Sequence, residues 1–455
     1  MHLFHQLKTH ALVTRVQRIV QKTPRWFVGM LLPMMIAQMI TIFYNTTDTF
    51  FAARLGTSAV ASVGLVFSIQ VILQAIGFGI GSGAGNLVTR ALDRADVVKA
   101  QQIFNSAMLM AFIGAVALMV PALMVLPDLM RALGATNTMM PFCMEYAQII
   151  LLGSPMMCLQ SVICCVLLNE GKGFTAVLGL ASGVLFNAAM NPLLIRYVGM
   201  GLTGAAWATV LGQGVSFVVL LYVFLNQRHA LYLDVRSVST DWQSYREICA
   251  KGKQTFCRQG TAGVMAVVLN FCAASFGDAA MASVTLANKI VLVIRNVLVG
   301  ATLSFQPVAG FHIVSGLLLR LREIFMVSAQ LGAGICLVAL VLVGLNVEMV
   351  FSWLRDNPAV ALVLKNAVFS ACVVTPLVAY SGALGRVYRF LGERCRPVLF
   401  FLGRYGIYLV CAGLILSSFA GFQGMTLTRS VLDVATFMVS LPLQFTVFKG
   451  MSGSK

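Results

Sequence analysis

The sequence predicts an all-α polytopic membrane protein, and three observations support this fold class. Hydrophobic residues make up 59% of the 455 residues and charged residues only 10%, which is far from the composition of an average soluble domain. Apolar runs long enough to cross a bilayer recur along the chain, and basic residues concentrate in alternate connectors. The spanning segments are expected to be helices, because a helix satisfies its own backbone polar groups in lipid.

About twelve apolar runs are long enough to span, six on each side of a polar stretch. A hydrocarbon core of about 30 Å requires about 20 residues of α-helix. We therefore expect two six-helix lobes, one in each half of the chain. The predicted spans are residues 26–53, 59–83, 103–126, 141–168, 174–195, 201–225, 259–276, 279–306, 324–346, 359–385, 397–418 and 425–448.

Basic residues indicate which helix ends face the cytoplasm. With the N-terminus inside, 23 Lys and Arg residues fall in inside segments and 6 in outside segments, a strong positive-inside pattern. Both termini are then cytoplasmic, and the protein is expected in the cytoplasmic (inner) membrane. The predicted parts are a basic amphipathic N-terminus, a first lobe, a cytoplasmic connector, a second lobe and a cytoplasmic tail, at 1–25, 26–225, 226–258, 259–448 and 449–455.

The two halves of the chain repeat one another. Residues 54–63 can be laid over residues 275–284, so that Gly56 meets Gly277. Because each half holds an even number of predicted spans, the copies share one orientation and are parallel repeats about an axis along the membrane normal. Two such lobes around a central cavity that opens alternately to each side are typical of secondary transporters.

Several other functions are disfavoured by the sequence. The net charge of +17 would suggest nucleic-acid binding in a soluble protein, but membrane topology accounts for it here. The 11 cysteines lie mostly in apolar runs without a Cys-x-x-Cys pair, which disfavours disulfides and zinc. Alternate glycines from Gly77 to Gly85 lack a following Lys-Ser or Lys-Thr, so we expect close helix contacts and no nucleotide loop. We expect no enzymatic activity and no cofactor, and a monomer that handles a small organic molecule.

Asp48 is the strongest candidate for a functional residue. It is the one ionisable side chain expected inside the first apolar run, where a charge is costly and marks an ion or substrate path. Its position near the end of the run leaves an interface carboxylate as the alternative. Tyr44 lies four residues earlier and therefore on the same helix face. Pro33 bends this helix or frees a carbonyl in it.

Two asparagines form a second polar pair within a predicted span. Asn187 and Asn191 are four residues apart, so they share one helix face, and Pro192 follows directly. Amides that face one way in lipid need partners, either across the lobe interior or as polar contacts that hold helices together. Both readings stay open at this point.

Six short segments, in this order and spacing, resemble the multidrug and toxic compound extrusion (MATE) transporters. They are residues 33–56, 169–173, 187–192, 201–209, 276–278 and 300–311. The resemblance covers both halves of the chain. It implies a two-lobed bundle of twelve helices that exports drugs and other organic cations in exchange for protons or sodium ions.

Within this family the pattern resembles the DinF-like branch, whose first lobe holds a cation site of acidic and polar residues. The resemblance assigns to this site Asp48, Tyr44, Tyr146, Asn187 and Thr209. The chain departs from the branch on the fifth span, where Asn191 stands at the position that usually carries a second Asp.

One carboxylate in place of two changes the expected ion chemistry. Two close carboxylates cannot both ionise easily, so they hold a proton between them. Asp48 lacks that neighbour, but an ionised Asp48 could form a monovalent-cation site with oxygens of Asn187, Asn191 and Thr209. Exchange for protons or for sodium ions therefore both stay open, and no other metal is expected. Glu145 is a poor replacement, because adjacent helical residues point about 100° apart.

The second half carries two unusual charges, Lys289 and Arg295, inside one predicted span. They can pair with Asp433, reach toward the cytoplasm, or form a basic cavity wall. With Asn270 and Gln306 they are the candidates for lining the substrate cavity. The proposed hinge residues are Pro33, Pro192 and Pro307.

The sequence thus predicts a secondary active antiporter that exports organic, mostly cationic compounds by alternating access, with Asp48 as the coupling carboxylate. The alternative is a flippase for a lipid-linked or anionic precursor, in which Lys289 and Arg295 would meet a pyrophosphate.

Overall fold

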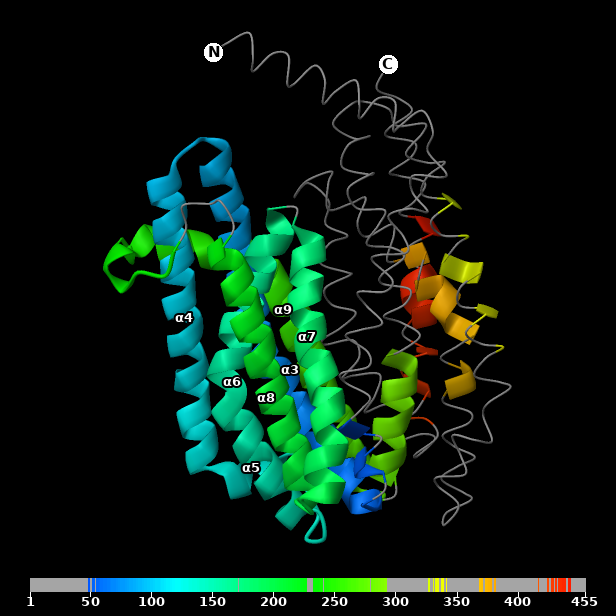
Figure 1. The fold of residues 1–455 in the computed structure, drawn as a ribbon. Coiled ribbons are helices and arrows are strands. Elements are labelled where there is room, and N and C mark those ends of the chain that lie inside the picture. The colour runs from blue at the N-terminus through cyan, green and yellow to red at the C-terminus, as the bar shows by residue number, and fades with distance from the viewer. Residues whose placement is uncertain are drawn as a thin grey trace.

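The structure of the chain is a computed structural model, and its described part is helical without strands. The residues that it describes are 48–49, 51–53, 55–170, 172–226, 232–239, 241–278, 280–292, 326–327, 330, 332–334, 337–338, 341, 368–370, 373–378, 380–381, 416, 424, 427–428, 430–431, 433–438 and 441–442. Figure 1 shows these segments as coloured ribbons. The predicted all-α fold is confirmed.

The second to sixth predicted spans are present as helices. These are α3 (Thr57–Asp93), α4 (Val97–Met124), α6 (Met140–Asn169), α7 (Gly173–Pro192) and α8 (Gly201–Asn226), with a short α5 (Leu126–Ala132) before α6. Five helices of the described part are long and apolar enough to cross a bilayer. After Pro192, α7 continues as the π-helix η1 (Leu193–Tyr197).

Two helices are longer than their apolar runs predict. Helix α3 extends ten residues beyond residue 83, and α9 (Trp242–Ala274) begins inside the polar connector, well before residue 259. Polar residues can continue a helix once it leaves the lipid, and side-chain caps then define its ends. Asp241 caps α9 by accepting from the Gln243 backbone N–H at 3.0 Å, and Asp96 caps α4 by accepting from Lys99.

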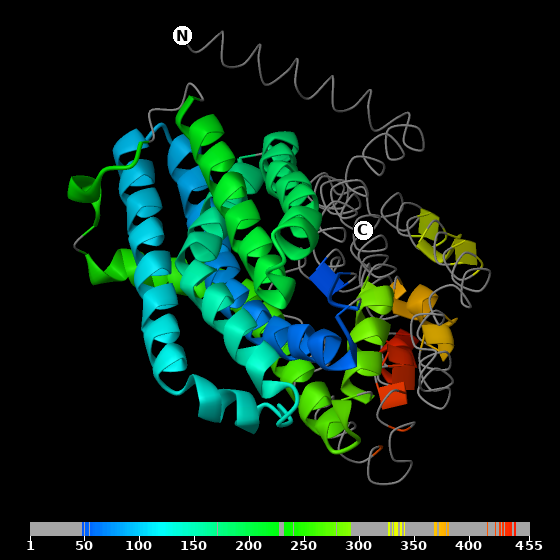
Figure 2. The same cartoon turned by 60° about the horizontal axis from the view of Figure 1, so that its bottom comes forward.

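Helix α3 is the central element of the described bundle. Helices α6 and α9 pack along it, α4 packs on its outer side, and α8 lies between α6 and α7 (Figures 1 and 2). The connector before α9 is bound to α4, because Asn105 Nδ2 donates to Ser237 Oγ at 2.8 Å and the Ser239 N–H donates to Ser106 Oγ at 2.9 Å. Helix α9 therefore starts beside α4 at the edge of the bundle and then runs along α3.

Alternate glycines of α3 face two different neighbours. A Cβ at Gly81 would lie 2.8 Å from the Val162 Cα of α6, whereas a Cβ at Gly83 would lie 2.1 Å from the Ile248 backbone oxygen of α9. Two helices can approach this closely only where a side chain is missing. The predicted close helix contacts are confirmed.

The two repeated turns adopt the same unusual backbone. Gly56 before α3 has φ 117° and Gly277 before the helix Ala280–Leu292 has φ 89°. A positive φ is readily adopted only by glycine. The matching turns support the internal repeat that the sequence indicates.

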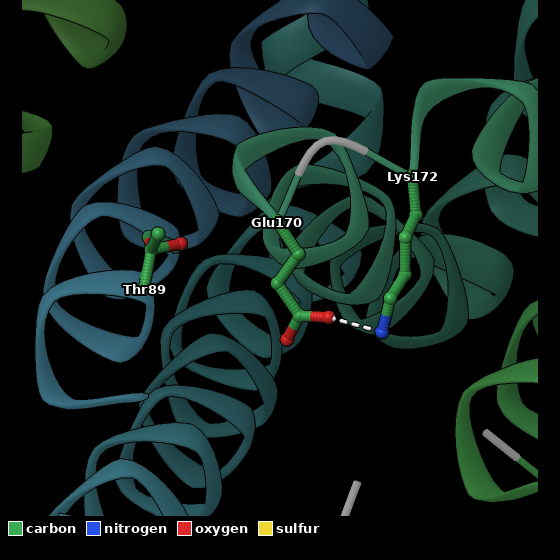
Figure 3. A network of polar contacts seen from close by, with 4 residues as sticks. Thr89, Glu170 and Lys172 are labelled. Carbon is green, nitrogen blue, oxygen red and sulfur yellow. Dashed lines mark hydrogen bonds and ion pairs between the residues drawn. The ribbon is translucent and has the colours of Figure 1, made fainter. Parts of the chain in front are cut away.

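An ion pair stabilises the turn between α6 and α7. Lys172 Nζ lies 2.6 Å from Glu170 Oε2, and the Glu170 side chain is only 5% exposed. Figure 3 shows this pair near Thr89 of α3. Segment 169–173, one of those that carry the family resemblance, thus contains a partly buried ion pair that fixes the end of α6.

Candidate ion-coupling site

Asp48 is buried against the first-lobe helices. Its side chain is 6% exposed, and Tyr146 of α6, Asn187 and Asn191 of α7 and Thr209 of α8 are each 2% exposed or less. The structure therefore brings Asp48 together with four of the five neighbours that the resemblance and the helix spacing suggest. These buried contacts do not fit the alternative in which Asp48 lies at the membrane interface and reaches water.

The two asparagines of α7 donate to the same carboxylate oxygen. Asn191 Nδ2 lies 3.0 Å from Asp48 Oδ1, and Asn187 Nδ2 lies 3.3 Å from it. The spacing of four residues places both amides on one face of α7, as their sequence positions predict. Both amides thus contact a carboxylate across the lobe interior, and Asn187 also donates to Thr209 of α8 at 3.2 Å.

Two hydroxyl groups donate to the other oxygen of the carboxylate. Thr209 Oγ1 lies 2.6 Å from Asp48 Oδ2, and the Tyr146 hydroxyl lies 3.5 Å from it. Hydrogen bonds to an ionised acceptor are shorter and stronger than neutral ones. Glu145, the neighbour of Tyr146, is exposed, so it takes no part in this cluster, in agreement with the expected 100° between adjacent residues.

One acceptor in the cluster has no partner. Asn191 Nδ2 also lies 3.1 Å from Asn187 Oδ1, but Asn191 Oδ1 is buried and has no hydrogen-bond partner among the described residues. A buried acceptor without a partner is costly. It is also an oxygen next to a carboxylate, which is the donor type that a monovalent cation requires. Asp48, Asn191 and the Thr209 hydroxyl therefore fit a small cation by their chemistry.

Lys289 lies on the helix Ala280–Leu292, in the second half of the chain, and is directed into the bundle. It is 7% exposed, its Nζ lies 3.8 Å from the centroid of the Phe67 ring of α3, and it interacts electrostatically with Asp48. An ammonium over an aromatic face is attracted by the ring. Pairing of Lys289 with Asp433 stays a prediction.

The remaining predicted residues divide into two groups. Asn270 of α9 is buried, and its Nδ2 donates to the Gly64 backbone oxygen of α3 at 3.1 Å. Pro192 ends α7. Outside the described residues lie Tyr44, Arg295, Gln306, Pro33 and Pro307.

A second polar cluster surrounds Asp278, which is not among the predicted site residues. Ser58 Oγ and Thr138 Oγ1 donate to its Oδ2 at 2.8 and 2.5 Å, and Thr136 Oγ1 donates to its Oδ1 at 2.6 Å. Although partial burial opposes ionisation, the three hydroxyl groups lower the pKa of Asp278 below its usual value. The cluster connects the start of α3 and the loop before α6 to the second half of the chain.

The sequence contained only a weak signal for this cluster. Asp278 follows a turn glycine at a predicted span end, a position typical of a helix cap. Its hydroxyl partners lie more than 130 residues away in the sequence, so no local pattern could pair them.

Known transporters resemble this chain in sequence. The family pattern described as MatE matches residues 33–193. The multidrug export protein MepA of Staphylococcus haemolyticus is 22% identical over 325 residues, which cover 70% of this chain and 72% of that protein. The FAD transporter of Shewanella oneidensis is 25% identical over 231 residues, which cover 49% of this chain and 51% of that protein.

Solved structures share the fold. A multidrug resistance MATE family transporter of the MOP superfamily in an inward-facing conformation superimposes with a TM-score of 0.83 at 20% identity, covering 93% of this chain and 99% of that one. An outward-facing structure of such a transporter gives a TM-score of 0.75 at 20% identity, covering 94% and 96%. The DinF-like branch stays a prediction. This chain thus resembles MATE transporters in sequence over residues 33–193 and shares its fold with solved MATE family structures.

Proposed function

We propose that this chain is a secondary active antiporter that exports organic, mostly cationic compounds in exchange for protons or sodium ions. Relatives named multidrug export proteins support this class of cargo. Asp48 is the residue that binds the coupling ion. The observation that carries the proposal is that one buried carboxylate receives hydrogen bonds from three neighbouring helices.

The geometry suggests how ion binding would change the packing of the lobe. An ionised carboxylate accepts all four hydrogen bonds at Asp48. A bound proton or cation removes the negative charge and occupies part of this acceptor capacity, so donors on α7 and α8 must turn to other partners. Ion binding would thereby alter how these helices are held against the helix that carries Asp48, which is the differential contact that alternating access requires.

A cation has oxygen ligands within reach at this position. The partnerless Asn191 Oδ1 adjoins the carboxylate, and rotation of the Asn191 amide would direct this oxygen toward Asp48. A proton needs only the carboxylate itself. The proposal therefore includes both ions, and a gradient experiment separates them.

The test uses full-length protein in inverted membrane vesicles with a fluorescent organic cation as cargo. Wild-type protein should drive uptake when a proton gradient or a sodium gradient is imposed, and Asp48→Asn should abolish uptake at an equal amount of protein in the membrane. Glu145→Gln is the matched control, because it removes an exposed carboxylate from α6 and should leave uptake unchanged. Uptake by Asp48→Asn at the wild-type rate would remove Asp48 from the mechanism.

The flippase alternative depends on a basic cavity wall formed by Lys289 and Arg295. Lys289 faces the Phe67 ring and the Asp48 charge, which favours a role within the bundle over contact with a pyrophosphate. We therefore propose export of organic compounds, by a monomer, as the function.

A further inference from the structure

An apolar groove lies between α3, α4 and α9, and the ion-coupling site does not use it. Its volume is about 600 Å³, and its walls include Ile76 and Ile80 of α3, Met110 and Gly114 of α4 and Phe256 of α9. This volume is within the usual range of ligand pockets, about 300–1,000 Å³. A Cβ at Gly114 would lie 3.3 Å from Ile76 Cγ2, so α3 and α4 come close together at this wall of the groove.

Two basic residues of α9 line the same groove. Arg246 and Lys253 are exposed and seven residues apart, so they lie on one helix face. Neither Arg246 nor Lys253 forms an ion pair with a carboxylate of the described residues. The groove is therefore apolar along its walls, with these two exposed cations at its margin.

The length of α3 indicates at which depth of the membrane these two cations lie. With 37 residues, α3 is about 55 Å long, whereas the hydrocarbon core is about 30 Å thick. Counted from Thr57 at the outer side, about 20 residues cross this core, which therefore ends close to Ile76 and Gly77. Gly79 adjoins Phe256 and Gly83 adjoins Ile248 of α9, so this part of α9 lies at the inner boundary of the lipid.

The first turns of α9 show the aromatic residues typical of a membrane interface. Trp242 is 78% exposed, and its ring centroid lies 6.5 Å from that of Tyr245. Trp and Tyr are enriched at the level of the lipid headgroups. By the positive-inside pattern, this interface is the cytoplasmic one, where anionic lipids attract Lys and Arg. Figures 1 and 2 show α9 beginning beside α4 at the edge of the bundle.

We propose that this groove binds an anionic phospholipid of the cytoplasmic leaflet. The phosphate group lies at Arg246 and Lys253, and one acyl chain lies along Ile76, Ile80 and Met110. Helices α4 and α9 have little direct contact, so the lipid fills the space between them. It thereby connects α9 to α4, while α9 itself packs directly on α3.

The test measures how lipid shields Cys249, which lines the groove and is exposed. Full-length protein is placed in nanodiscs of phosphatidylcholine alone or with phosphatidylglycerol, and maleimide labelling of each cysteine is followed by mass spectrometry. Phosphatidylglycerol should slow the labelling of Cys249 several-fold. Cys257, on the same helix but outside the groove lining, is the internal reference and should label at the same rate in both.

Charge variants decide whether the headgroup is recognised. Arg246→Gln and Lys253→Gln, separately and together, should remove the slowing by phosphatidylglycerol. Lys251→Gln is the matched control, because Lys251 is exposed on the same helix but does not line the groove, and this variant should keep the slowing. Equal protection by phosphatidylcholine alone, an absence of protection, or protection that survives in the double variant would each overturn the proposal.

Discussion

Thr209 Oγ1 donates to Asp48 Oδ2 across 2.6 Å, although the two residues lie 161 positions apart in the sequence. No other contact to this carboxylate is as short within the described residues. Thr209 also receives a hydrogen bond from Asn187 Nδ2 at 3.2 Å. Since the hydroxyl accepts from an amide, its own proton is directed to Asp48, and the pair favours the ionised carboxylate.

Replacing Thr209 by Val should therefore weaken the ionised state of the site. A hydrogen bond to a charged group is worth about 1.5–3 kcal/mol, so export should fall roughly tenfold to a hundredfold, provided that this bond forms in only one state of the cycle. Thr209→Ser keeps the hydroxyl and should retain most of the activity. Initial rates of cargo export from cells with matched protein levels measure the effect, and equal losses in both variants would assign Thr209 to packing alone.

Asn191→Asp should change which ion the site handles. Asn191 Nδ2 lies 3.0 Å from Asp48 Oδ1, and two carboxylates at this distance hold a proton between them near neutral pH. The variant should transport with a proton gradient and lose any stimulation by sodium. Export in proteoliposomes, compared at several pH values with and without sodium, tests this expectation. Unchanged ion dependence would show that Asn191 does not select the ion.

Lys289→Gln removes a positive charge near Asp48 and should therefore change how tightly the site binds its coupling ion. The Lys289 ammonium lies over Phe67 and interacts with Asp48, so its removal leaves the negative charge of Asp48 less balanced and strengthens the binding of a coupling cation. A gain of ~1.4 kcal/mol corresponds to a tenfold lower half-saturating ion concentration, together with slower release and slower export. Lys289→Arg retains the charge and should stay close to wild type. If Lys289→Gln and Lys289→Arg had the same half-saturating ion concentration, the charge of Lys289 would not control ion binding at Asp48.

The main features of the Asp48 site could be predicted from the sequence, for identifiable reasons. Asp48 is conspicuous because a charge in lipid is costly, and the spacing of Asn187 and Asn191 places both amides on one face. Thr209 and Tyr146 have no such local signal. They were predicted only through the family resemblance, and the structure places both beside Asp48.

The contacts between distant segments could not be predicted. The length of α9 is set by packing on α3 and by its Asp241 cap, not by apolarity, so the predicted span started too late. Lys289 was seen as an unusual charge, but its contact with Phe67 depends on how two helices pack. Asp278 and the groove beside Arg246 likewise depend on segments that meet only in the folded bundle.

The Asp278 cluster should make stability depend on acid pH. An unfolded Asp has a pKa of about 3.9, and the native pKa of Asp278 is lowered. Its stabilising contribution is therefore complete above the unfolded pKa and is lost as pH falls through the native pKa, so no change is expected between about pH 5 and 8. Asp278→Asn should lower stability by about 1–2 kcal/mol at neutral pH and flatten the acid response. Melting temperatures in detergent from neutral to acid pH provide the measurement, and an unchanged acid response in the variant would contradict this assignment.

Gly83→Ala tests the close packing of α3 on α9. A Cβ at this position would lie 2.1 Å from the Ile248 backbone oxygen, and backbone cannot turn aside as a side chain can. Overpacking of this kind costs about 1–3 kcal/mol, which should appear as a lower melting temperature in detergent. Gly260→Ala is the control, because a Cβ there meets nothing within 4 Å. Since alanine is the better helix former by about 1 kcal/mol, Gly260→Ala should be neutral or stabilising. Equal melting temperatures for the two variants would mean that α3 and α9 separate easily at this level of the membrane.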